Sequence, residues 1–150
     1  MAAYGRFSGL LVLMLVTTAP ALAQEPSPAG KVKVATGSAF IVRGSETLPA
    51  RPGDVILVSD ALQTGVDGAL GVTLQDDTRL SLGPSSEVLV ERYVFAPDDS
   101  ALGMVLKFVR GVATYVSGRM AKLAPDAIRL ETPAAIVGVR GTSLAIRVER

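Results

Sequence analysis

The stretch "ALGVTLQDDTRLSLG", residues 69–83, decides the fold, because two alternating runs flank one polar turn. Its large apolar side chains fall at every second position: Leu70, Val72, Leu74, Leu80 and Leu82. Alternation of apolar with small or polar residues is typical of half-buried β-strands. The stretch therefore predicts two strands that are joined by a bend at Asp76 and Asp77.

The same period of two continues along the chain. It appears in "KVKVATG" (31–37), "AIRLET" (127–132) and "SLAIRVE" (143–149). Turn signals separate these runs: Asp67-Gly68 predicts a β-hairpin, Gly83-Pro84 a bend, and "APDDSA" (96–101) a longer polar tip. Residues 117–127 lack clear alternation and predict a loop or a single helical turn.

These patterns predict an all-β protein of about ten short strands. Alternation alone does not choose between a β-solenoid, a barrel and a sandwich. The tripeptide "VRG" occurs at 42–44, 109–111 and 139–141, but its unequal spacing argues against a repeat array. We interpret the first two copies as glycine turns that each close a strand.

The first 23 residues have the three-part layout of a secretory signal peptide. Arg6 supplies the positive region, an apolar run follows, and Ala21-Leu22-Ala23 offers small residues for cleavage before Gln24. An uncleaved anchor is the alternative, although the apolar run is short for a span of about 20 residues. We expect a periplasmic or secreted protein with no membrane span after cleavage, a flexible lead at 24–30 and one β domain at 31–150.

The composition of the chain limits the classes of ligand and reaction that we expect. The formal net charge is +1, and Arg6 leaves with the signal, so no cationic footprint for nucleic acid is expected. The chain has no cysteine, histidine, tryptophan or asparagine. It therefore lacks disulfides, the usual zinc ligands and Ser-His or Cys-His nucleophile pairs. Adjacent acids on a strand point to opposite faces, so neither 76–77 nor 98–99 forms a catalytic dyad. No catalytic, cofactor or metal residue is predicted.

The closing stretch "TPAAIVGVRGTSLAIRVER", residues 132–150, sets Arg140 between Gly138 and Gly141. In a structural role, Arg140 would fold back onto the carbonyl groups of a neighbouring turn or pair with Asp76 or Asp77. In a functional role, its planar fork would hold a carboxylate or phosphate of a ligand. We favour the structural role, in which the motif locks the last strand into the sheet.

The order of these signals resembles the FecR-type domain, the periplasmic module of the ferric-citrate regulator and its relatives. The resemblance covers about Ala39 to Val148. Its most specific residues are Pro133, Gly138, Arg140, Gly141 and Thr142, with Asp76 and Thr78 as a weaker piece. The family usually has glycine after that first aspartate, whereas this chain has Asp77, which tolerates a left-handed turn less well than glycine.

The resemblance implies a solenoid-like or barrel-like β fold. In the regulators, a cytoplasmic segment and a membrane helix precede this domain and control a sigma factor, and a small α/β domain follows it. Only six residues precede the apolar run here, and the chain ends with the last expected strand, so we do not expect the sigma-regulating role to carry over.

The leading hypothesis is an exported, non-enzymatic interaction or sensory module that binds an unknown protein or a cell-envelope partner. A glycan-binding or peptidoglycan-binding module is the alternative. A hydrolase built on carboxylates is a third and weaker hypothesis, because no partner group for the acids is visible.

Overall fold

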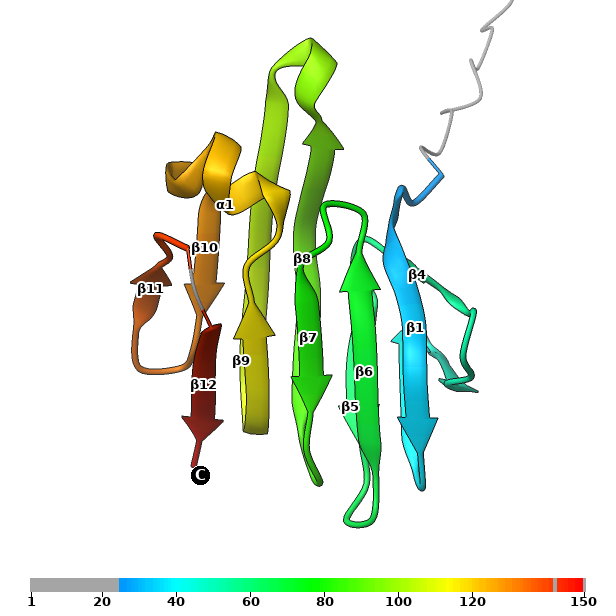
Figure 1. The fold of residues 1–150 in the computed structure, drawn as a ribbon. Coiled ribbons are helices and arrows are strands. Elements are labelled where there is room, and N and C mark those ends of the chain that lie inside the picture. The colour runs from blue at the N-terminus through cyan, green and yellow to red at the C-terminus, as the bar shows by residue number, and fades with distance from the viewer. Residues whose placement is uncertain (1–24, 142, 150) are drawn as a thin grey trace, which may run out of the picture.

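The computed structural model describes residues 25–141 and 143–149, and it confirms an all-β fold. Twelve strands form one sheet that curls into a half-barrel (Figure 1). The strands are β1 (Pro28–Thr36), β2 (Ala39–Arg43), β3 (Glu46–Pro49), β4 (Val55–Leu57), β5 (Ala61–Thr64), β6 (Ala69–Leu74), β7 (Arg79–Leu82), β8 (Glu87–Ala96), β9 (Ala101–Val116), β10 (Ile128–Glu131), β11 (Ile136–Gly138) and β12 (Ser143–Val148). The sequence underestimated this number because strands as short as β4 and β11 are too brief to show a period.

The sheet has two halves that share strand β9. Half A has the order β4-β1-β6-β7-β9-β12 and uses the second part of β9. Half B has the order β3-β2-β5-β8-β9-β10-β11 and uses the first part. All pairings are antiparallel except that of β10 with β9. In Figure 1, half A faces the viewer and β5 of half B lies behind β6.

Gly111 marks the place where β9 passes from one half to the other. Residues 101–110 pair with β8, and residues 111–116 pair with β7 and β12. Gly111 has φ of +81°, and a Cβ there would collide with Ser86 and the Ser85 carbonyl. Only glycine suits this combination of backbone angle and close approach. The expected turn at Gly111 is thus wrong, because the glycine lies inside a 16-residue strand.

The core lies between the two halves and follows the predicted alternation. Leu70, Val72 and Leu74 are buried, as are Leu80 and Leu82 on β7. Half B contributes an equivalent row: Leu62, Val88, Val90, Leu106 and Phe108. These residues form one continuous apolar cluster. Burial of such side chains contributes about 1.5–3 kcal/mol each relative to exposure, so the shared cluster holds the two halves together.

The turn at Asp67-Gly68 does not form the expected hairpin. β5 pairs with β2 and β8, whereas β6 pairs with β1 and β7, so the turn carries the chain from half B to half A. A Cβ on Gly68 would collide with the Ser38 carbonyl, which explains the glycine by close packing. The turn signal was correct, but a local signal does not say which strands pair across it.

A half-buried ion pair fixes a second crossing between the halves. Arg43, at the end of β2, donates from Nε and Nη2 to the two carboxylate oxygens of Asp60 at 2.9 and 2.7 Å. Asp60 is fully buried and also accepts the Leu57 amide. Arg43 also donates to the Val55 carbonyl. Two-point binding of this kind orients both groups and is stronger than a single contact.

One boundary differs slightly from the sequence prediction. β1 begins at Pro28, before the expected domain start at Lys31, because Pro28 pairs with Leu57 and Gly30 packs against the backbone of β6. The irregular stretch at 117–127 contains the short helix α1 (Arg119–Leu123) and a 3-10 turn (Pro125–Ala127), as expected.

None of the helices in the described ranges has the length and apolar character needed to cross a bilayer.

Candidate functional site

Asp76 is a buried hub at the bend between β6 and β7. Its Oδ1 accepts hydrogen bonds from the Thr78 amide and the Tyr93 hydroxyl at 3.3 and 2.8 Å. Its Oδ2 accepts from the Thr78 hydroxyl and the Met120 amide at 2.7 and 3.2 Å. Asp76 and Thr78 are both fully buried. Four donors satisfy the hydrogen-bonding capacity of the carboxylate. Asp76 and Thr78 therefore connect the β6–β7 hairpin to β8 and α1.

Tyr93 connects the two halves through this hub. Its hydroxyl accepts a hydrogen bond from the Asp76 amide at 2.8 Å while it donates to the carboxylate. Burial raises the pKa of the Tyr93 phenol far above its ordinary value, and the bond to Asp76 raises it further. A neutral phenol beside a carboxylate that has all its donors offers no free acid or base.

Asp77 adopts the left-handed conformation, with φ of +68°, where the family usually has glycine. Its exposed carboxylate lies 3.2 Å from Arg119 Nε. Arg119 also donates to the Gln75 carbonyl and stacks 4.8 Å from the centre of the Phe95 ring. The adjacent acids therefore have separate structural partners, as expected for residues that point in opposite directions.

The C-terminal motif begins with a tight turn between β10 and β11. Thr132 and Ala135 close it through the Thr132 amide and the Ala135 carbonyl at 2.8 Å, and the Thr132 hydroxyl accepts the Ala135 amide at 3.1 Å. Pro133 occupies the first central position of this turn, where its fixed φ is favourable. Pro133 is exposed and lies far along the hairpin from Arg140.

The rest of the motif carries the chain from β11 in half B to β12 in half A. Gly138 ends β11, Val139 is buried, Arg140 is exposed, and Gly141 has φ of +54°. Thr142 lies outside the described residues. A positive φ is the left-handed conformation that glycine adopts without steric cost.

The structure contradicts the expected pairing of Arg140 with Asp76 or Asp77. Asp76 is enclosed by other donors, and Asp77 pairs with Arg119. Across residues 25–141 and 143–149, Arg140 has no hydrogen bond or ion pair. The fold-back of an arginine onto a carboxylate and a carbonyl occurs instead at Arg43, in the first copy of the tripeptide.

A groove runs beside Arg140. It encloses about 530 Å³ and is lined by Pro125, Asp126, Ile128, Arg129, Gly138, Val139 and Arg140. The sequence argument missed Arg129, which is exposed on β10 and pairs directly with Gly138. The outward position of Arg129 in "AIRLET" was visible in the alternation, but its register against β11 was not.

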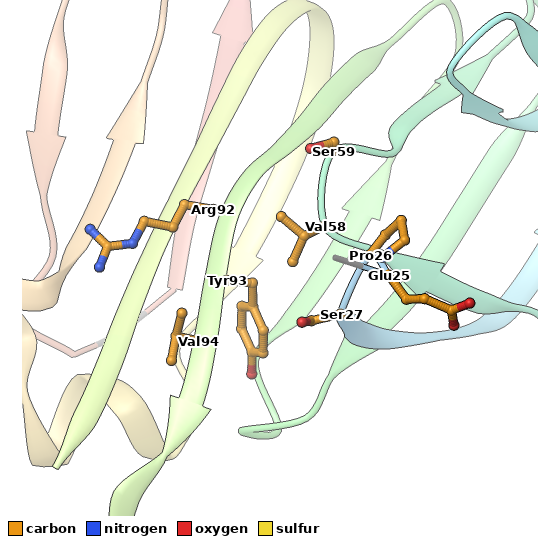
Figure 2. Close-up of a pocket in the computed structure, with 8 residues that line it drawn as sticks. All are labelled: Glu25, Pro26, Ser27, Val58, Ser59, Arg92, Tyr93 and Val94. Carbon is orange, nitrogen blue, oxygen red and sulfur yellow. The ribbon is translucent and has the colours of Figure 1, made fainter. Parts of the chain in front are cut away.

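A second, larger hollow is less suited to a ligand. It encloses about 650 Å³ between the lead at Glu25–Ser27, the turn at Val58 and Ser59, and β8 (Figure 2). The Tyr93 hydroxyl in its wall is already bound to Asp76. Arg92 extends away from Ser27 on the other side of β8, where its guanidinium covers Gly103. The polar groups around this hollow therefore do not converge on its interior.

The remaining acids offer no metal centre in the part of the chain that the structure describes, where no three acidic side chains gather as ligands. Asp98 and Asp99 lie exposed in the 3-10 turn Pro97–Asp99 at the tip between β8 and β9. Dedicated calcium loops take several spaced oxygen ligands, and this tip presents only two adjacent carboxylates.

Comparison with known proteins identifies the family. The family model described as FecR protein matches residues 60–150, which is more than half of the chain. The chain belongs to the FecR family. The match includes both FecR motif pieces, the Asp76 hub and the groove at Arg140. Membership in the FecR family gives the chain a regulatory or sensory signalling role in general terms. No curated protein and no solved structure gives a match.

Proposed function

We propose that this FecR-family chain is an exported, non-enzymatic sensory module that binds a protein partner through the groove beside Arg140. One observation carries the proposal: the two motif pieces are used in opposite ways. Asp76 and Thr78 are buried and bonded to each other, whereas Arg140 is exposed and has no partner among the described residues. A charged side chain that the fold does not use is available to a ligand.

A protein partner is favoured over a glycan by the aromatic side chains. Sugar-binding modules stack their ligands on exposed rings. Within the described residues, Tyr93, Phe108 and Tyr115 are buried, and Phe40 and Phe95 are half-buried. The groove itself has no aromatic residue in its lining. Its charged groups suit the side chains or terminus of a polypeptide.

Site-directed photo-crosslinking in cells tests the partner proposal. A photo-reactive residue at Ile136, exposed on β11 beside the groove, should trap a protein of defined mass. The same residue at Ser81, exposed on the outer face of β7, serves as the control position. Arg140→Gln should abolish the Ile136 adduct, whereas Arg79→Gln should leave it in place.

Purified Arg140→Gln protein should keep its free energy of unfolding within about 0.5 kcal/mol of wild type, as surface substitutions do. A crosslink that survives Arg140→Gln would refute the groove as the binding site. Export is tested separately by fractionation and N-terminal sequencing, where the processed chain should begin at Gln24. A product that starts at Met1 and stays in the membrane would contradict a cleaved signal.

A further inference from the structure

Arg129 and Arg140 line the same groove beside the β10–β11 hairpin. Arg129 lies directly opposite Gly138 in the antiparallel ladder. Residues that face each other across such a ladder point to the same side, with Cβ atoms about 4.5–5.5 Å apart. Arg140 follows two residues after Gly138, beyond the end of β11, and it is exposed and lines the same groove as Arg129.

Gly138 leaves open space in the lining of the groove. A Cβ at this position would meet no atom within 4 Å. Any larger residue would place its side chain directly beside Arg129 and fill the floor of the groove. The missing side chain therefore leaves an open recess opposite Arg129.

Neither guanidinium is fully used by the fold. Arg140 has no hydrogen bond or ion pair with a described residue. Arg129 Nη2 lies 3.5 Å from Glu131 Oε1, with half of the arginine side chain exposed. Such exposed pairs contribute little. Five N–H donors per arginine leave most of the fork of Arg129 available.

The charge of the groove favours an anion. Its lining contains Arg129 and Arg140 against Asp126, which gives one net positive charge. Asp126 is exposed and forms no ion pair with a described residue. An anionic carboxylate matches this balance, and its two oxygens fit the planar fork of an arginine.

We infer that Arg129 and Arg140 form a clamp over Gly138 that binds one carboxylate group of a polypeptide partner. This inference rests on the proposed function, because it names the chemistry recognised at the same groove. Arginine is suited to this role, since its planar fork matches the two oxygens of a carboxylate. The carboxylate belongs either to an acidic side chain or to a chain terminus.

Titration of purified ¹⁵N-labelled protein with short peptides tests the clamp, with the arginine Nε–H resonances as the direct readout. One peptide is acetylated, has a free C-terminal carboxylate and lacks acidic side chains. A second is amidated and carries one glutamate, and a third replaces that glutamate with glutamine. We expect the first or the second to shift both arginine resonances, which identifies the source of the carboxylate, and the third to shift neither.

Variants separate the clamp from general attraction. Arg129→Gln and Arg140→Gln should each weaken binding at least about tenfold, or about 1.4 kcal/mol. Gly138→Val should weaken it similarly by filling the recess. Asp126→Asn should strengthen it about twofold, and this gain should disappear at high salt because the charge is exposed. Arg79→Gln should change nothing.

Equal binding of the glutamine peptide, or no resonance shift with any peptide at millimolar concentration, would overturn the clamp. Tighter binding of inorganic phosphate than of either carboxylate peptide would overturn it as well. Loss of the crosslink in Arg140→Gln together with no peptide binding would leave the proposed function standing and remove only the clamp. Peptide binding together with an unchanged crosslink would do the reverse.

Discussion

Arg43 and Arg140 occupy the same position in two copies of Val-Arg-Gly, yet they have opposite surroundings. Arg43 is held by both oxygens of the buried Asp60, whereas Arg140 stands in solvent beside a groove. In both places the tripeptide supplies an arginine followed by a glycine turn. The residues that surround each arginine in space decide what that arginine does. Sequence reasoning assigned the fold-back to the wrong copy, because Asp60 is distant from Arg140 and its proximity to Arg43 appears only in the fold.

At the residue scale, Asp76 offers the sharpest stability prediction. Asp76→Ala should lower the free energy of unfolding by at least about 3 kcal/mol, because it leaves the Tyr93 hydroxyl, the Thr78 hydroxyl and the Met120 amide without their acceptor. Asp77→Gly, at the adjacent residue, is the matched control. It removes an exposed ion pair but relieves a positive φ, so it should be neutral or stabilising by up to about 1 kcal/mol.

Chemical denaturation of wild type and the two variants measures both changes in the free energy of unfolding. The comparison requires that the free energy depends on denaturant concentration with the same slope in all three proteins. A loss below about 1 kcal/mol in Asp76→Ala would mean that solvent reaches the hub and replaces the lost acceptor.

Tyr93 predicts a loss of stability at alkaline pH. The folded chain raises the pKa of this phenol above the ordinary value of about 10, so the unfolded chain releases its proton first. The contribution is therefore fully present below about pH 10 and declines as the pH rises further. Tyr93→Phe should be less stable near neutral pH but should lose less stability between about pH 9 and 11. Melting temperature against pH, measured for both proteins, gives the two slopes, and equal slopes would contradict the assignment.

At the scale of elements, the two faces of β7 give a direct test of strand orientation. Leu80→Asp buries a carboxylate with no partner in the apolar cluster and should unfold the domain, since the cost is several kcal/mol against a typical stability of about 5–15 kcal/mol. Ser81→Asp places the same charge on the exposed face of the same strand and should melt near wild type. Circular dichroism of both variants decides the matter, and equal melting temperatures would reverse the assigned faces.

Strand faces were predictable because alternation is a local property, as Leu70 and Leu80 show. Pairing was not predictable, because it depends on partners that are remote in sequence. The Asp67-Gly68 turn was assigned to a hairpin although it joins the two halves, and Arg129 escaped notice because only the ladder places it beside Gly138. The motif residues of the candidate site stand out in the sequence, whereas their neighbours in space appear only in the fold.

For the whole molecule, Gly111 predicts cooperative unfolding. Gly111→Val introduces a positive φ in a β-branched residue and a collision with Ser86, at the strand that both halves share. We expect a cost of at least about 3 kcal/mol and a single melting transition at lower temperature. Gly44→Ala, at a positive φ in open space, is the control and should cost about 1 kcal/mol. Two separate transitions in Gly111→Val would show that the halves fold independently.

The shared strand also sets rules for engineering this chain. A fluorescent tag or an affinity epitope placed within β9 would interrupt both halves at once, because neither keeps its order of strands without it. The exposed tip at Pro97–Asp99 joins β8 to β9 outside the core, and exposed tips of this kind tolerate insertion. A sensor built on this domain should carry its reporter at that tip, where an insertion leaves the pairings of β9 with both halves intact.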